Sequence, residues 1–297
     1  METDIPASWT QLPFAELRGV LLIVGASDTG KSTLGRYLYE SLRGMGCCVA
    51  YLDGDPGQST LGPPATITLG LASGDETAFP PQGRVWQRFI GSVSPRGHML
   101  PLLSGARRLI DAARDAGAEV IIYDTTGLVD SAQGGVTLKL AKVDLLCPST
   151  VIAIQRGQEL EPLLSPLRRS HRVRLIELQP SPAVRPRDLA TRQAHRAAQF
   201  ARYFAAAHSK VVNWEEVAVF PAPDFVFGQL VALEDADGFT MGLGIVRQAD
   251  FRSRQVVLHT PLASLRGVDA VRLGDLVIDQ STYRDRRLIS YQTGGLS

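Results

Sequence analysis

The chain of 297 residues is long enough for one large domain or two modest ones, and 44% of its residues are hydrophobic against 21% charged. This balance is typical of a soluble globular protein with a full core. The 31 basic and 30 acidic side chains nearly cancel, which excludes a strong overall positive field. A nucleic-acid partner would therefore have to meet a local basic patch.

The cysteines and the N-terminus bear on location. Cys47, Cys48 and Cys147 are odd in number and lack the spacing of metal ligands, which favours a reducing compartment. Residues 1–11 contain acids and no apolar core, unlike a signal peptide. No apolar run approaches the length that crosses a bilayer. We expect a cytoplasmic protein without a membrane partner.

The first motif lies between a predicted strand at 20–24 and a predicted helix at 34–42. It reads GASDTGKST and matches GxxxxGK[ST] in the order strand, loop, helix that a phosphate-binding loop requires. The glycines let backbone N–H groups surround a triphosphate, and the helix N-terminus adds partial positive charge. Lys31 would reach the β- and γ-phosphates of ATP, and the Ser32 hydroxyl would bind Mg²⁺. The candidate nucleotide-binding residues are Gly25, Ala26, Ser27, Asp28, Thr29, Gly30, Lys31, Ser32 and Thr33.

A second predicted strand, at 48–52, leads into two carboxylates, Asp53 and Asp55. Acids at the carboxyl end of a parallel strand point into the crevice where α/β sheets bind ligands. The Pro-Gly pair after Asp55 forces a turn that would hold this side chain toward the phosphates. The alternative is a solvated turn made of ordinary turn residues.

The next stretch has weaker patterning. Residues 61–83 are rich in Gly, Pro and Thr, so we expect irregular structure there. Residues 88–98 read as a short apolar piece and then a polar loop with Arg96 and His98. Helical spacing predicts a helix over 100–116.

A third predicted strand, at 120–123, also ends in an acid, Asp124. Apolar residues followed by an aspartate are the usual second signature of nucleotide-binding folds, where the acid holds Mg²⁺ directly or through water. A helix is expected at 136–143, with strands at 151–154 and 173–178. Strands alternating with helices predict an α/β fold, a P-loop NTPase-type parallel sheet with helices on both faces.

Arginines dominate residues 168–202. A helix is expected to begin near Pro186, whose fixed φ suits a first turn. Arg192 and Arg196 lie one turn apart on it and share a face with two aromatic residues. Two such arginines can clamp a phosphoryl group, so we expect a lid over about 180–204. The alternative is an ordinary solvated helix face.

Beyond residue 213, short β-type runs alternate with turn residues. They predict a small β-rich domain without a catalytic constellation. We therefore expect an N-terminal extension (1–18), a P-loop kinase domain that includes the arginine-rich lid (19–210) and a β-rich C-terminal domain (211–297).

Five segments together point to one family. They are GASDTGKST at 25–33, YLDGDPGQS at 51–59, FIGSVSPRGHMLP at 89–101, DTTGLV at 124–129 and RxxxRxxxFxxYF at 192–204. In this order they resemble the Clp/Grc-type polynucleotide 5′-hydroxyl kinases over roughly residues 5–297, in the compact prokaryotic form. Many enzymes share the phosphate loop, whereas the combination is specific.

The resemblance implies transfer of the γ-phosphate of ATP to the 5′-hydroxyl end of RNA or DNA, with Mg²⁺ as cofactor. Asp55 would act on the attacking hydroxyl, and Thr125 would belong to a clasp that holds the lysine and phosphates, with Leu128 where some members have tryptophan. The implied catalytic residues are Lys31, Asp55, Thr125, Arg192 and Arg196; the metal ligands are Ser32, Asp55 and Asp124; the substrate-binding residues are Asp53, Gln58, Arg96 and His98.

Several alternatives stay open on the sequence. An adaptor that binds ATP without catalysis would keep the phosphate loop but needs no acceptor-side acid. A small-metabolite kinase would not need the lid and the β-rich domain. Whether Asp53 or Asp124 contacts the metal is undecided, His98 also fits an ordinary loop residue, and Trp9 fits either stacking on adenine or packing. No residue identifies RNA rather than DNA as the acceptor.

Overall fold

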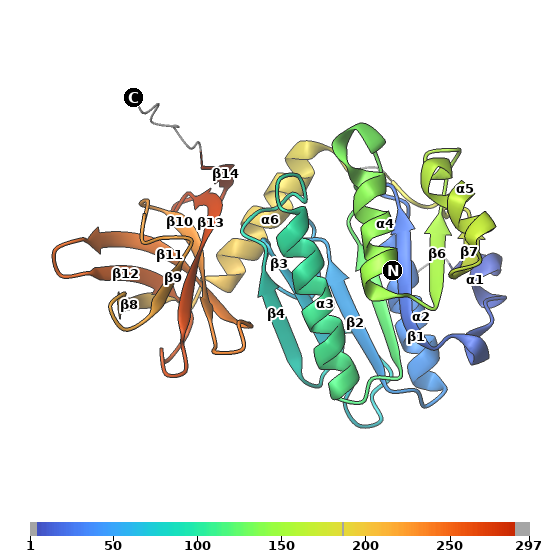
Figure 1. Cartoon of the computed structure of the whole chain (residues 1–297), viewed down its shortest axis with the longest axis horizontal. Helices are drawn as coiled ribbons and strands as arrows, with labels where there is room; N and C mark the ends of the chain where they lie inside the picture. The colour runs from blue at the N-terminus through green and yellow to red at the C-terminus, as the bar shows by residue number, and fades with distance from the viewer. Residues whose placement is uncertain (1–4, 186, 289–297) are drawn as a thin grey trace. The chain divides into compact units, whose positions relative to one another are not determined.

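The computed structural model describes residues 5–185 and 187–288, and the chain divides into two compact units at Leu189/Ala190. The first unit contains a seven-stranded sheet in the order β4-β3-β2-β5-β1-β6-β7 (Figure 1). Strands β1, β2, β5, β6 and β7 are parallel, which confirms the predicted α/β fold. The strands are β1 Gly19–Gly25, β2 Val49–Gly54, β3 Thr66–Leu71, β4 Val85–Phe89, β5 Val120–Thr125, β6 Thr150–Ile154 and β7 Arg174–Leu178.

Helices cover both faces of this sheet. In Figure 1, α3 and α4 lie in front of the strands and α2 lies behind them. The helices of the first unit are α1 Ala7–Thr10, α2 Lys31–Gly44, α3 Met99–Asp115, α4 Gly135–Leu146 and α5 Glu161–Ser170, with short 3₁₀ turns at Phe14–Glu16 and Ser131–Gln133. In the part of the chain that the structure describes, none of the helices has the length and apolar character to span a membrane.

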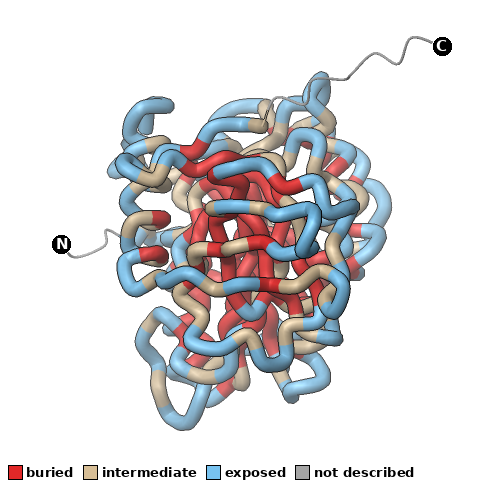
Figure 2. The backbone as a smooth tube through the Cα atoms, turned by 90° about the vertical axis from the view of Figure 1, so that its left-hand side faces the viewer, coloured by how far each residue is buried: buried red, intermediate tan, exposed pale blue. Residues whose placement is uncertain are grey.

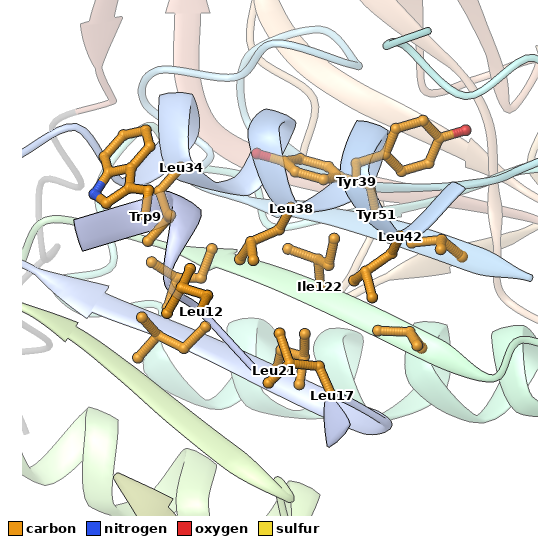
Figure 3. Close-up of a cluster of buried hydrophobic side chains, with 14 of the residues drawn as sticks. Trp9, Leu12, Leu17, Leu21, Leu34, Leu38, Tyr39, Leu42, Tyr51 and Ile122 are labelled. Carbon is orange, nitrogen blue, oxygen red and sulfur yellow. The ribbon is translucent and has the colours of Figure 1, made fainter. Parts of the chain in front are cut away.

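The core behind the sheet explains why α2 is amphipathic. Leu34, Leu38 and Leu42 recur along one side of α2 and pack onto Leu21 and Ile122 of the central strands (Figure 3). Trp9 is 1% exposed and belongs to the same cluster, so packing accounts for it. Figure 2 shows that buried backbone follows the interior strands while the outer turns are exposed.

Residues 61–83 differ from the expectation of irregular structure, because they contain β3. Strand β3 pairs antiparallel with β2 and with β4, which extends the parallel sheet at one edge. Five of its six residues are buried, and Thr66 and Thr68 are among them. Threonine is β-branched and fits a pleated sheet, but here it alternates with Ile and Leu among glycines and prolines, which obscured the strand.

The second unit joins helix α6 (Leu189–Tyr203) to a β-rich sheet. Six strands follow the order β14-β13-β10-β11-β12-β8, and β9 pairs with β13. The strands are β8 His208–Asn213, β9 Ala218–Phe220, β10 Gln229–Glu234, β11 Thr240–Asp250, β12 Gln255–Thr260, β13 Ala270–Ile278 and β14 Asp285–Arg287.

Helix α6 packs with this sheet through its aromatic end. Phe204 is 1% exposed and stacks near His259 and Tyr283, with ring centroids 6.3 Å and 6.4 Å away. The Tyr203 hydroxyl accepts a hydrogen bond from the Leu243 N–H at 2.8 Å. The helix that carries Arg192 and Arg196 therefore belongs to the compact unit of the β-rich sheet, whereas the sequence placed it with the kinase domain.

Candidate active site

The phosphate loop has the tight curl that its glycines predict. Gly30 has φ of 91° and Asp28 has φ of 54°, both in the left-handed region. A Cβ on Gly25 would lie 2.7 Å from Thr29 Oγ1 and 2.8 Å from the Ile154 carbonyl oxygen, so a larger residue would displace the loop. Gly25 and Gly30 are therefore needed for the backbone shape of the phosphate loop.

Lys31 begins helix α2 at the end of this loop. Its side chain is nearly buried, and Nζ donates to the Ala26 carbonyl oxygen at 2.6 Å, so it folds back over the loop. Burial lowers the pKa of Lys31, while Asp124, Asp55 and Asp28 act in the opposite direction. The first N–H groups of α2 have no intrahelical partner, so they and Lys31 form an anion site.

Asp124 ends β5 next to the loop and is 3% exposed. Its Oδ2 accepts from Ser32 Oγ at 2.5 Å and from Tyr51 Oη at 3.2 Å. Its Oδ1 is buried and has no hydrogen-bond partner among the described residues. Burial raises the pKa of Asp124 to about 6, with Lys31 and the Ser32 hydrogen bond opposing the shift.

This donor set fits Mg²⁺. A hard cation prefers a carboxylate and a hydroxyl oxygen, and it would meet the unpaired Oδ1 of Asp124 and the hydroxyl of Ser32. A protein site for Mg²⁺ with a nucleotide usually needs only one or two protein ligands, because water and phosphate supply the rest. Accordingly, the described ranges contain no cluster of three or more His, Cys, Asp or Glu side chains suited to a metal.

Asp53 pairs in register with Asp124 across β2 and β5, but its carboxylate is already occupied. Its Oδ2 accepts from the N–H groups of Thr60 and Leu61 (the latter at 3.0 Å) and from the Ser59 hydroxyl at 3.1 Å. Burial raises the pKa of Asp53, and these backbone hydrogen bonds oppose the shift. The side chain therefore anchors the 59–61 turn, and Asp124 is the better candidate for the metal.

Asp55 lies at the turn after β2 and is half-buried. Its Oδ1 accepts from the backbone N–H groups of Gly57 and Gln58 at 3.0 Å and 3.2 Å, so the turn fixes the carboxylate. Asp55 is also one of the acids whose charge acts on Lys31 and Asp124. The structure thus brings the second-strand acid, the loop lysine and the Ser32–Asp124 pair together.

The Asp55 turn also contacts the polar loop before α3. A Cβ on Gly57 would lie 2.4 Å from the Val93 carbonyl oxygen, so glycine allows the two segments to touch. Arg96 is exposed in this loop, and His98 precedes α3 with Nδ1 3.3 Å from the Arg96 carbonyl oxygen. Gln58 Oε1 is buried without a hydrogen-bond partner in the described residues. The predicted acceptor-side residues therefore come from two touching loops.

Thr125 has its hydroxyl fully engaged. Oγ1 donates to the Ile23 carbonyl oxygen in β1 at 2.7 Å and accepts from Lys139 Nζ at 2.7 Å. The segment that it begins touches the phosphate loop, since a Cβ on Gly127 would lie 2.3 Å from Ser27 Oγ. The hydroxyl of Thr125 is therefore bonded within the protein, and Gly127 makes the close approach to the loop.

Two lysines of α4 face the end of β5, and neither was predicted to have a role. Lys139 and Lys142 are both 0% exposed. Burial lowers the pKa of Lys139 well below its ordinary value and that of Lys142 to about 7. The signal in the sequence is two lysines three residues apart in a helix whose only other charged residue is Asp144, where solvated lysines are expected on a polar face.

The segment before α6 contacts the phosphate loop at Asp28. Arg187 donates to the Asp28 carboxylate from its backbone N–H at 3.1 Å and from Nε at 3.3 Å. Arg156 donates to the Asp28 carbonyl oxygen. A Cβ on Gly30 would be 3.5 Å from Val184. Part of the predicted lid region therefore lies against the loop within the first unit, although Pro186, the predicted helix start, lies outside the described residues.

Arg192 and Arg196 lie on α6 in the second unit. Arg196 forms a two-pronged ion pair with Asp285 of β14, with Nε–Oδ1 at 2.9 Å and Nη2–Oδ2 at 3.1 Å. The two side chains are 16% and 6% exposed. Gln193 donates to the Asp285 carbonyl oxygen at 3.4 Å. The spacing of the arginines could not predict that Arg196 pairs with Asp285, because the two residues are 89 positions apart in the sequence.

Comparison with known proteins finds relatives along most of the chain. Relatives include polyribonucleotide 5′-hydroxyl-kinases of Methanocaldococcus jannaschii, 24% identical over 88% of this chain and 87% of that protein, and of Thermococcus kodakarensis, 27% identical over 88% of each. A solved Clp1p–Pcf11p complex shares the fold, with a TM-score of 0.65, 12% identity and coverage of 87% of this chain and 74% of that one. The model for the mRNA cleavage and polyadenylation factor CLP1 P-loop matches residues 25–206. The chain belongs to this CLP1 P-loop family.

Proposed function

We propose that this protein is an ATP-dependent polynucleotide kinase that transfers the γ-phosphate of ATP to the 5′-hydroxyl end of RNA or DNA. The observation that supports it is the meeting of three features at the ends of β1, β2 and β5. These are the buried Lys31, the Ser32–Asp124 pair and the fixed carboxylate of Asp55. The relatives from Methanocaldococcus jannaschii, Pyrococcus abyssi and Thermococcus kodakarensis are named polyribonucleotide 5′-hydroxyl-kinases, which agrees with this function.

On the nucleotide side, the loop and α2 bind the phosphates of ATP through backbone N–H groups. Lys31 leaves the Ala26 carbonyl oxygen, 2.6 Å away, and contacts the β- and γ-phosphates. Ser32 and Asp124 would hold Mg²⁺, which neutralises charge on the phosphates when bound. Phosphate charge also stabilises the ammonium of Lys31 against the desolvation that lowers its pKa.

On the acceptor side, the 5′-hydroxyl oxygen attacks the γ-phosphorus in line while the bond to the β,γ-bridging oxygen breaks. Asp55 orients the hydroxyl and accepts its proton. Gln58, Arg96 and His98 lie on the two touching loops on this side and would contact the terminal nucleotide. Contacts of this kind orient an end without reading its sequence.

The lid completes the proposed chemistry. Arg192 and Arg196 would stabilise the charge on the transferring phosphoryl group, as guanidinium groups do in related reactions. For Arg196, this role requires it to exchange Asp285 for the phosphoryl oxygens. Thr125 would contribute by holding the 125–127 segment against the loop rather than by contacting phosphate itself.

The test is transfer of labelled γ-phosphate to matched oligonucleotides. We expect label on 5′-hydroxyl RNA or DNA, none on the same oligonucleotide already carrying a 5′-phosphate, and none with Lys31→Met. ATP binding without transfer to any oligonucleotide would instead indicate an adaptor. Faster transfer to free nucleosides than to oligonucleotides would indicate a small-metabolite kinase.

A further inference from the structure

Helix α4 buries two lysine side chains that phosphate binding does not explain. Lys139 and Lys142 lie one turn apart on Gly135–Leu146, and neither is exposed to solvent. A buried ammonium is unfavourable unless other groups satisfy it. Their surroundings in the first unit therefore indicate what each lysine does.

The two lysines differ in their bonding. Lys139 Nζ donates to Thr125 Oγ1 at 2.7 Å and to the Thr126 carbonyl oxygen at 2.6 Å, and it lies 3.5 Å from Thr126 Oγ1. Lys142 Nζ makes no hydrogen bond within the described ranges and lies 4.3 Å from the centroid of the Tyr123 ring. Of the two lysines, only Lys139 donates hydrogen bonds to Thr125 and Thr126 at the end of β5.

That segment contacts both the end of β1, which leads into the phosphate loop, and the loop itself. Thr125 donates to the carbonyl oxygen of Ile23, two residues before the loop begins. Gly127 approaches so closely that a Cβ there would lie 2.3 Å from Ser27 Oγ and 2.7 Å from Ser27 N. A shift of the segment would therefore displace Ser27, whose backbone is part of the anion site.

We propose that Lys139 is a positioning residue of the nucleotide site, whose buried Nζ group holds Thr125–Gly127 against the phosphate loop and keeps the loop in its phosphate-binding shape. Lys139 acts through the segment and does not touch ATP. Without it, the Thr126 carbonyl oxygen loses its lysine donor at a buried position, and Thr125 Oγ1 loses the hydrogen bond that it accepts. The part that concerns turnover rests on the proposed kinase function, whereas the part that concerns ATP binding does not.

The test compares Lys139→Met with the matched control Lys142→Met, which removes an equally buried lysine side chain from the same helix without removing a hydrogen bond. The dissociation constant of a fluorescent ATP analogue with Mg²⁺ is measured at pH 8, alongside melting temperature. We expect binding about tenfold or more weaker in Lys139→Met and within about twofold of wild type in Lys142→Met, with both variants melting well above the temperature of the binding measurement. Equal loss in the two variants, or unchanged binding in Lys139→Met, overturns the proposal.

Two further variants keep the proposal testable if Lys139→Met does not fold. Thr125→Val removes the hydroxyl that Lys139 bonds, and Gly127→Ala forces a Cβ against Ser27. Both are expected to weaken binding of the ATP analogue at least fivefold, and wild-type affinity in both overturns the proposal. If the wild-type protein transfers no phosphate to oligonucleotides but the binding pattern holds, the kinase proposal fails and the role of Lys139 stands.

Discussion

Ser32 donates a hydrogen bond from Oγ to Asp124 Oδ2 over 2.5 Å, and this bond joins the first turn of α2 to the end of the neighbouring strand β5. The other carboxylate oxygen, Oδ1, has no hydrogen-bond partner in the described part of the chain although it is buried. A buried carboxylate oxygen without a donor is unfavourable unless a cation completes its surroundings. This relationship makes the Ser32–Asp124 pair the most direct target for a metal experiment.

We expect Asp124→Asn to raise the Mg²⁺ concentration for half-maximal phosphate transfer by about tenfold or more, because a neutral amide oxygen binds a hard cation less tightly than a carboxylate. The measurement is a Mg²⁺ titration of activity at saturating ATP. Asp53→Asn is the control, since its carboxylate bonds the 59–61 turn. Its activity can fall, but its Mg²⁺ midpoint should stay near that of wild type. An unchanged midpoint in Asp124→Asn would remove Asp124 from the metal site.

The acceptor-side acid gives a second prediction. Asp55→Asn should lower kcat by roughly 10²- to 10⁴-fold, the range of general-base catalysis, with ATP affinity within a few-fold of wild type. The reason is that asparagine keeps an oxygen that can accept from the Gly57 and Gln58 N–H groups, so the turn persists while the base is lost. Single-turnover rates and ATP binding are measured on the same preparations. Parallel losses in both would mean that Asp55 only shapes the nucleotide site.

The sequence was most informative where chemistry fixes several neighbouring residues at once. The phosphate loop needs glycines, a lysine and a hydroxyl at set spacings, and its position between β1 and α2 followed from the motif. Asp124 was found because β5 is a buried apolar run that ends at the ligand edge of a parallel sheet. Both the phosphate loop and Asp124 could therefore be predicted from residues that are close together in the sequence.

Features that depend on distant partners were not predictable in this way. The sequence cannot show that the ammonium of Lys139 bonds Thr125, or that Asp53 is used by the 59–61 turn while Asp124 is not. The pairing of Arg196 with Asp285 joins segments far apart in the chain. In each case the tertiary partner, rather than residue type or spacing, determines what the side chain does.

The Arg196–Asp285 pair leads to a third prediction, which separates stability from catalysis. Arg196→Met should destabilise the β-rich unit by about 3 kcal/mol or more, because it leaves a buried carboxylate unpaired. Adding Asp285→Leu should restore most of the stability, since two apolar side chains replace both charges. If Arg196 also stabilises the charge on the transferring phosphoryl group, the kcat of the double variant should remain below that of wild type, by on the order of 10³-fold.

Melting temperature and kcat at saturating ATP distinguish these outcomes. Arg192→Met provides the comparison one turn earlier on α6. Recovery of both stability and turnover in the double variant would limit Arg196 to holding α6 on the β-rich sheet, and the proposed lid would then depend on Arg192 alone.

The last prediction concerns Lys142 and pH. Burial lowers the pKa of this lysine from 10.5 to about 7 in the folded protein, and the charges of Asp55 and Asp124 oppose the shift. Lys139 lies one turn away on the same helix, and the Tyr123 ring packs against the Lys142 Nζ group. Between about pH 7 and pH 10.5 the unfolded chain holds a proton that the folded protein has released. The contribution of Lys142 to the free energy of unfolding therefore rises with pH across this window, by up to about 1.4 kcal/mol per unit.

Lys142→Met removes this dependence. Methionine has a similar length and makes favourable contacts with aromatic rings, so it should pack over Tyr123. We expect the variant to be more stable than wild type by a few kcal/mol at pH 6, where the lysine is charged in both states, and the difference to shrink steadily toward pH 10. Urea-unfolding free energies of both proteins at pH 6, 7, 8 and 9 measure it. A stability difference that stays constant over this range would show that Lys142 does not titrate there, because only a change in its bound protons makes the difference depend on pH.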